Sequence, residues 1–287
     1  MDPVSDHVEL RFRPRRVLLA VLVACVTLEL LFVWLDYSVN YGRWTDIGAI
    51  RRLVNITRED GLAGWFQPVQ TLLVALTLWA IWMVDRRQGP GRRWSLGWAV
   101  VAAFFTYMAV DDGTKMHERF GTAAGVASER GSSSVATTGD ALLALFPSYA
   151  WQVVLLPVLA ALGIFTLCFL WRRLADRFSR LLVVAGLGCF AVAIGLDFVE
   201  GLPRRHPLNV QTWVVEHVPL DRFSRRRFGR SAPDTVDHFA KALEETLEAF
   251  GTTLLWLAFL RHLMGRSSEL RLRFADAPAG VRREEED

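Results

Sequence analysis

The densest group of reactive side chains lies in residues 111–118, directly after an apolar run from Trp94 to Val110. The group holds three carboxylates, one amine and one imidazole: Asp111, Asp112, Lys115, His117 and Glu118. If one helix continues through it, Asp111, Lys115 and Glu118 share a face, and His117 points beside that face. Ionisable groups at membrane depth usually face a bundle interior or a wet cavity. We therefore expect this group to face inward.

Further carboxylates lie near one end of other apolar segments. They comprise Glu29 and Asp36, Asp197 and Glu200, and Glu244, Glu245 and Glu248, the last three close to His238 and Lys241. The chain has only two lysines, Lys115 and Lys241, and each stands four residues before or after a carboxylate. Because so many like charges repel one another, the pattern predicts a bound cation or protonated carboxylates as well as the lysines.

A divalent metal ion is the first interpretation of this pattern. Carboxylates with histidine suit Mn, Fe or Zn, whereas oxygen ligands alone suit Mg or Ca. The predicted ligands come from three segments: Asp111, His117, Glu118, Asp197, Glu200, His238, Glu245 and Glu248. The groups expected to surround them or balance their charge are Glu29, Asp36, Asp112, Lys115, Lys241 and Glu244. The Glu-x-x-His spacing of ferritin-like di-iron proteins is absent from this group.

The elements that must position these groups are apolar segments of membrane-spanning length. There are six of them: Val17–Tyr37, Trp65–Val84, Leu96–Asp112, Tyr149–Trp171, Leu181–Val199 and Ala240–Leu260. Only helices and closed barrels satisfy the backbone in lipid, and the segments lack the short alternation of barrel strands. The sequence predicts an all-α membrane protein, a six-helix bundle over residues 17–262. A basic lead (1–16) precedes it and a charged tail (263–287) follows.

Arginine distribution predicts the orientation of this bundle. Four arginines stand in each of two short loops, at Arg86, Arg87, Arg92 and Arg93 and at Arg172, Arg173, Arg177 and Arg180. Because short basic loops stay cytoplasmic, both termini are expected in the cytoplasm and the protein in the plasma (inner) membrane. The long loop after the fifth span is also basic. Its Arg204, Arg205, Arg225, Arg226 and Arg227 are expected to contact an anionic lipid headgroup.

Three local expectations concern the connections. Thr45–Ile56 predicts a short amphipathic helix on the membrane surface. The segment Gly121–Gly139, rich in Gly, Ser, Thr and Ala, predicts a flexible loop. Pro157 predicts a kink in the fourth span.

Two classes of function remain open. One is a metal-dependent enzyme acting on a lipid or lipid-linked substrate. The other is a cation- or proton-coupled transporter, although no inverted repeat is evident. An accessory subunit of a membrane complex and a purely structural charge network are further alternatives. The sequence contains no G-x-S-x-G, Walker A, HExxH or CxxC motif, so it leaves the reaction and the catalytic residues unknown. It contains no nucleic-acid-binding motif, so no nucleic-acid partner is expected. It leaves the oligomeric state open.

Overall fold

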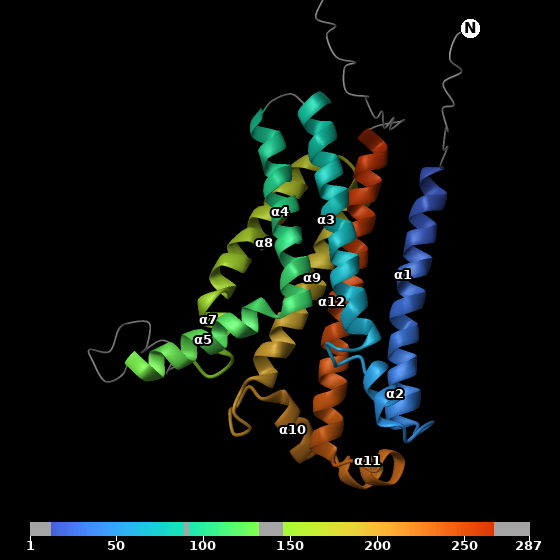
Figure 1. Cartoon of the computed structure of the whole chain (residues 1–287), viewed down its shortest axis with the longest axis vertical. Coiled ribbons are helices and arrows are strands. Elements are labelled where there is room, and N and C mark those ends of the chain that lie inside the picture. The colour runs from blue at the N-terminus through green and yellow to red at the C-terminus, as the bar shows by residue number, and fades with distance from the viewer. Residues whose placement is uncertain (1–12, 89–91, 132–145, 267–287) are drawn as a thin grey trace, which may run out of the picture.

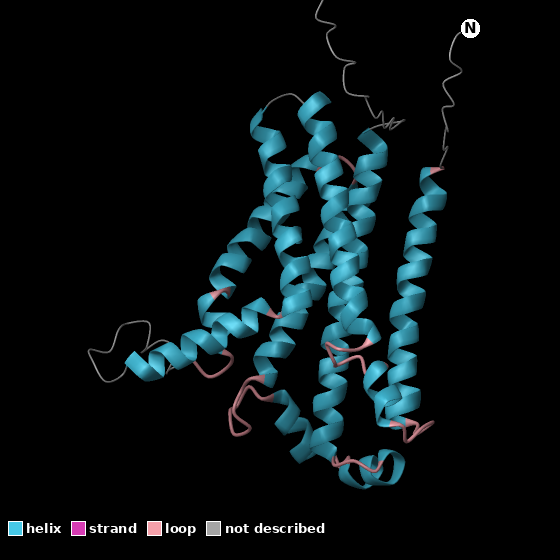
Figure 2. Ribbon diagram, in the orientation of Figure 1, coloured by secondary structure: helices cyan, strands magenta, loops and turns pink. Residues whose placement is uncertain are grey.

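A computed structural model describes residues 13–88, 92–131 and 146–266, and these contain only helices and loops (Figure 2). The long helices are α1 (Pro14–Asp36), α3 (Leu62–Gln88), α4 (Arg92–Thr114), α8 (Leu156–Arg173), α9 (Arg177–Glu200) and α12 (Ala232–Arg266). The shorter ones are the π-helix η1 (Tyr37–Tyr41), α2 (Gly48–Leu53), α5 (Met116–Gly131), α7 (Ala150–Val154), α10 (Val210–His217) and α11 (Asp221–Phe228). The predicted all-α class is confirmed.

Five of these helices are long and apolar enough to cross a membrane: Pro14–Tyr41, Leu62–Arg87, Trp94–Thr114, Leu156–Arg173 and Arg177–Glu200. Helix α12 runs alongside them with 35 residues, and its first half carries the charged groups. The protein is thus a helical bundle with several apolar helices, as a membrane protein requires. The sixth span and the orientation of the termini stay predictions.

The bundle has two distinct ends (Figure 1). We call the end with Pro14, Arg173 and Arg266 the terminal end, and the opposite end, with α2, α10 and α11, the loop end. The candidate groups named above lie in the loop-end half. Helix α5 leaves the bundle sideways on the same half.

An apolar core fills the terminal half of the bundle. Trp98, Leu78, Leu170 and Phe259 are fully buried there, and they come from four different long helices. Helices α9 and α12 approach each other closely at Gly186, where a β-carbon would lie only 2.9 Å from a backbone oxygen of α12. Small residues permit such close helix packing in membranes.

Local signals explain several helix boundaries. Pro157 lies in the first turn of α8, and the helical conformation is interrupted at Leu155 between α7 and α8. The kink expected near Pro157 is therefore present. Asp176 caps α9 by accepting a hydrogen bond from the backbone N–H of Ser179 at 2.9 Å. Gly229 ends α11 in the left-handed conformation, with φ of 66°.

The structure confirms one predicted connection and corrects another. Helix α2 forms inside the segment Thr45–Ile56, as predicted. The flexible loop predicted over Gly121–Gly139 is wrong as far as Gly131, because α5 continues through that part; the remainder lies outside the described residues. Gly121 is accommodated because it packs against α7, where a β-carbon would lie 2.6 Å from the backbone nitrogen of Trp151.

Candidate functional site

The helix predicted to continue through residues 111–118 instead breaks at Lys115. Helix α4 ends at Thr114 and α5 begins at Met116, and Lys115 between them has a positive φ of 53°. The prediction that Asp111, Lys115 and Glu118 share one helix face is therefore wrong. The break bends the chain so that α5 turns aside from α4, and the backbone N–H of His117 donates to Oδ1 of Asp111 at 2.8 Å.

This bend brings the carboxylate of Asp111 and the imidazole of His117 together. Nδ1 of His117 lies 2.6 Å from Oδ2 of Asp111, and Tyr107 donates its hydroxyl to Oδ1 at 3.4 Å. The His117 ring rests edge-on against Trp151 at 4.9 Å between centroids. When Nδ1–H donates to the carboxylate, the lone pair of a neutral imidazole stands on Nε2. That atom points toward Glu118, whose Oε1 is 3.8 Å away.

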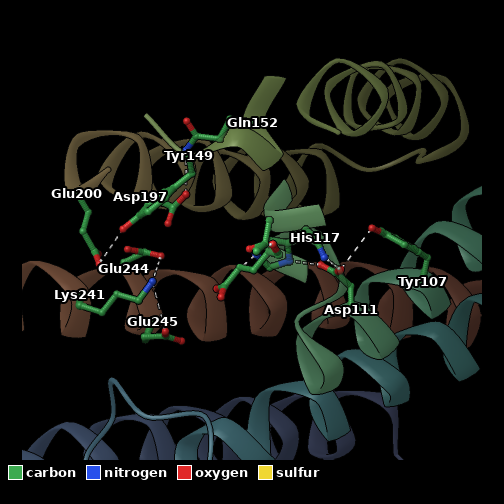
Figure 3. A network of polar contacts seen from close by, with 12 residues as sticks. Tyr107, Asp111, His117, Tyr149, Gln152, Asp197, Glu200, Lys241, Glu244 and Glu245 are labelled. Carbon is green, nitrogen blue, oxygen red and sulfur yellow. Dashed lines mark hydrogen bonds and ion pairs between the residues drawn. The ribbon is translucent and has the colours of Figure 1, made fainter. Parts of the chain in front are cut away.

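A second group of polar side chains lies where α12 faces α9 and α7 (Figure 3). Nζ of Lys241 is 2.7 Å from Oε1 of Glu244 and 3.9 Å from Oε1 of Glu245, and both glutamates are buried. On α9, Asp197 accepts a hydrogen bond from Nε2 of Gln152 at 2.8 Å. Glu200 accepts one from the hydroxyl of Tyr149 at 3.4 Å. The expectation that Lys241 lies on a carboxylate face is confirmed.

Three oxygens in this second group lack a hydrogen-bond partner among the residues that the structure describes. They are Oε2 of Glu200, Oε2 of Glu244 and Oε1 of Gln152, and all three are buried. Buried polar atoms are nearly always hydrogen-bonded, so unpaired ones call for an explanation such as water or an ion. All three are acceptors, and the group they lack is therefore a donor or a cation.

Lys115 brings its charge to the same region from the break between α4 and α5. Burial lowers the pKa of its ammonium group, but the carboxylates of Glu245 and Asp112 outweigh burial and raise the pKa above its ordinary value. Glu248 also contributes to this effect. Lys115 therefore stays protonated among the carboxylates.

The second predicted histidine ligand, His238, belongs to a separate pair. Its Nε2 lies 2.7 Å from Oδ2 of Asp36. The other oxygen of this carboxylate, Oδ1, accepts a hydrogen bond from the side chain of Asn40 at 2.9 Å. The imidazole packs on the ring of Tyr41 at 4.6 Å. Helices α1 and α12 are thus tied together here, and the described contacts do not join this pair to that of Asp111 and His117.

Glu29 is the carboxylate closest to the apolar core. It is buried, and its Oε1 accepts hydrogen bonds from Thr253 at 2.6 Å and from Gln70 at 3.4 Å. Glu29 lines a small cavity of about 10 Å³ together with Gln67 and Glu245. A space of this size is near the minimum for one water molecule.

The predicted ligands do not converge as a closed metal site. Within the described ranges, no three or more His, Cys, Asp or Glu side chains are arranged so that they could hold a metal ion. The metal site and its ligand set stay predictions.

Sequence reasoning missed several partners of these carboxylates. Gln152, Tyr149 and Tyr107 donate hydrogen bonds to them, and Trp151 packs against the ring of His117, although none of the four is itself charged. Gln152 had a usable signal, since it is the one amide in an otherwise apolar segment. The others had none, because aromatic residues at the ends of spans are common.

The fold and this buried polar half define a class: helical-bundle proteins with several membrane-compatible helices and a charged interior at one end. Within that class the chain matches, over residues 17–263, the family model described as a domain of unknown function (DUF8692), and it belongs to that family. The match runs from the first turn of α1 to the last turn of α12. No curated protein and no solved structure matches the chain.

Proposed function

We propose that this is a multi-pass membrane protein that binds a divalent cation in the loop-end half of its bundle and uses it in a reaction on a lipid or lipid-linked substrate. One observation carries the proposal: the unpaired buried oxygens of Glu200, Glu244 and Gln152, beside carboxylates that outnumber their cationic partners. Such oxygens accept a cation at little further cost, because their desolvation has already been incurred.

Charge supports the same conclusion. Eight carboxylates belong to the two groups around α4, α5, α9 and α12, and only two lysines accompany them. The carboxylates are Asp111, Asp112, Glu118, Asp197, Glu200, Glu244, Glu245 and Glu248. Ionised carboxylates this close together raise one another's affinity for protons or cations. A divalent ion would neutralise two charges at once.

The chemistry of the ligands favours a hard cation. The unpaired atoms are oxygens, and His117 and His238 each already contact an aspartate. Oxygen ligands favour Mg²⁺, Ca²⁺ or Mn²⁺ over Zn²⁺ or Fe²⁺. Mg²⁺ in particular keeps several of its waters and needs only one or two carboxylates, so convergence of three side chains is not required.

Each residue has a defined part in the proposed reaction. Glu200, Glu244 and Asp197 would hold the cation, which supplies Lewis-acid polarisation of a carbonyl or phosphoryl oxygen. Asp111 orients His117 so that Nε2 is free to accept a proton. Gln152 holds the Asp197 carboxylate in place.

The basic segment between α9 and α12 would bind the headgroup of the substrate. Its candidate contacts are Arg204, Arg205, Arg225, Arg226 and Arg227. Among the described residues, Arg225 forms an exposed ion pair with Asp221 at 2.8 Å, and Arg204 interacts electrostatically with Asp237. Arginine forks suit phosphate oxygens, so the others are available for an anionic headgroup.

The test is metal content and thermal stability of the detergent-solubilised protein after chelation and re-addition of Mg²⁺, Ca²⁺, Mn²⁺, Zn²⁺ or Fe²⁺. We expect near-stoichiometric binding of a hard cation and a rise in Tm, because the ion binds the folded state. Glu244→Gln should lose both effects, whereas Glu216→Gln, at an exposed glutamate of α10, should keep them. The proposal fails if no ion binds and Tm depends only on pH.

Proton coupling is a second candidate, and Glu29 favours it. Its hydrogen-bond donors, Thr253 and Gln70, are uncharged, and within the described part of the chain the buried carboxyl has no cationic partner of its own. A carboxyl in this setting takes up a proton readily. Proton uptake into liposomes that contain the protein would then fall in Glu29→Gln. If flux is absent in the wild type, this candidate is excluded.

A further inference from the structure

A basic pocket at the terminal end is the strongest feature that the loop-end site does not explain. It is a hollow of about 440 Å³ between the start of α1, the α8–α9 connection and the end of α12. Four arginines and a histidine line it: Arg15, Arg173, Arg261, Arg266 and His262. It lies on the side of the apolar core away from Glu29 and Lys241.

The carboxylates near this pocket do not balance its arginines. Asp85 contacts both Arg173, at 2.9 Å, and Arg266 through the same oxygen, Oδ1. Asp176 accepts from Arg261 at 3.1 Å. Arg15 has no hydrogen bond or ion pair within the described residues. The pocket therefore carries two more positive than negative charges.

Two buried nitrogens at the pocket also lack a partner. Nε of Arg173 and Nε2 of His262 are both shielded from solvent, and neither makes a hydrogen bond in the part of the chain that the structure describes. Arg173 is held in place by its stacking over Trp94, with 5.3 Å from Cζ to the ring centroid. A fixed guanidinium with an unused N–H is prepared for an acceptor such as a phosphate oxygen.

The surroundings place this pocket at a membrane surface. Arg261 lies over Phe178 and Arg180 over Trp171, at 5.5 Å and 5.3 Å, so arginines and aromatic rings alternate around the helix ends. Such belts mark the headgroup level of a bilayer. One turn below Arg15, Leu18 lines the same pocket and packs against the apolar core, and the next residue, Leu19, is exposed on the outer side of α1. A ligand with an anionic head and an apolar tail fits both parts.

We propose that this pocket binds the phosphate group of an anionic membrane lipid. Arg15, Arg173 and Arg266 would hold the phosphate oxygens, and the acyl chains would lie along α1. Free inorganic phosphate has the same oxygens, but it lacks the part that would contact Leu18. The proposal does not depend on the metal site.

The test measures the Tm of the full chain in neutral detergent while phosphatidylglycerol, phosphatidylcholine or inorganic phosphate is added. We expect phosphatidylglycerol to raise Tm in a saturable way, as a ligand of the folded state does. Phosphatidylcholine and inorganic phosphate should do so only weakly. Equal shifts with inorganic phosphate would identify a free-anion site and overturn the lipid as the ligand. Equal shifts with phosphatidylcholine would overturn charge recognition.

Variants identify the pocket as the source of the shift. Arg15→Gln should weaken the apparent affinity for phosphatidylglycerol by about tenfold, the effect of losing one charge-assisted hydrogen bond. It should leave the lipid-free Tm unchanged, because Arg15 has no described partner to lose. Arg172→Gln is the matched control, since Arg172 is exposed at the same end of α8 and lies outside the pocket. Equal losses in Arg15→Gln and Arg172→Gln, or no loss in either Arg15→Gln or Arg266→Gln, would overturn the proposal.

Discussion

The ion pair of Lys241 offers the sharpest test of how the loop-end half is held together. Its Nζ lies between two buried carboxylates, 2.7 Å from Glu244 and 3.9 Å from Glu245. The Lys241 side chain is 26% exposed, and that of Glu244 is 6% exposed. Lys241→Met keeps most of the length of the side chain and removes the charge. Both glutamates then remain buried without their nearest cation.

The expected loss follows from this geometry. Removing one partner of a buried ion pair costs about 3–5 kcal/mol, because the other charge stays desolvated. In a chain of this size each kcal/mol lowers Tm by about 2–4 °C. The two figures together predict a fall in Tm of about 6–20 °C. The fall should be smaller at about pH 5 than at about pH 8, since an uncompensated carboxylate takes up a proton.

The assay is thermal unfolding of wild type and variants in one detergent at both pH values. Arg225→Gln is the matched control, because its partner Asp221 is 56% exposed and surface pairs contribute only about 0–1 kcal/mol. Lys241→Met combined with Glu244→Gln should recover most of the loss, since neither charge then remains. If Lys241→Met and Arg225→Gln have the same small effect, or if the double variant is no better than the single one, the ion pair does not hold the site together.

Three other features give shorter predictions. Burial lowers the pKa of Lys115, but the neighbouring carboxylates raise it by more, so the pKa in the folded state lies above the ordinary value of about 10.4. The stability that Lys115 contributes should therefore be complete below about pH 10.4 and be lost as the pH rises through the folded-state pKa. Lys115→Met should lose this pH dependence of the free energy of unfolding. Gly186→Leu should lower the free energy of unfolding by at least about 1–3 kcal/mol, because the new side chain overpacks against α12. Gly188→Ala should have no such effect, because the space where its β-carbon would lie is open. Cysteines introduced at Arg87 and Arg226 should react with impermeant reagents from opposite sides of the membrane, and labelling from the same side would contradict the bundle topology.

The helices were predictable from the sequence because lipid leaves the backbone few choices. Apolar segments of about 20 residues must form helices to satisfy their own N–H and C=O groups. The kink at Pro157 was predictable for a similar reason, since proline lacks the N–H that a helix needs. The polar first half of α12 was visible as charge at helical spacing. Composition alone therefore identified which helices carry the charged groups.

The bend at Lys115 was not predictable from the sequence. It depends on a positive φ at a lysine, and no glycine or proline at this position signals it. Gly113, two residues earlier, is the conspicuous helix breaker, yet it remains inside α4. Helical spacing therefore placed His117 beside the face of Asp111, whereas the break places it in hydrogen-bonding contact. The ring of His117 packs against Trp151, which lies far away in the sequence, and a tertiary contact of this kind cannot be predicted from the local sequence.

The two kinds of basic residue in this chain occupy different surroundings. Arginines lie at both ends of the bundle, and at the terminal end their planar groups stack on Trp94, Trp171 and Phe178. Its only two lysines stand among the loop-end carboxylates. A guanidinium suits the bidentate, aromatic-lined contacts of a membrane surface, whereas a compact ammonium fits between closely packed carboxylates.

The two proposed sites lie at opposite ends of the bundle and differ in charge. The terminal end has an excess of fixed positive charge and unused N–H donors, and it would recruit phosphate. The loop end has an excess of carboxylate and unused oxygens, and it would recruit a cation. The apolar core around Trp98 and Phe259 lies between them. Because these two ends share no charged residue, lipid binding at one and metal binding at the other should respond to separate substitutions.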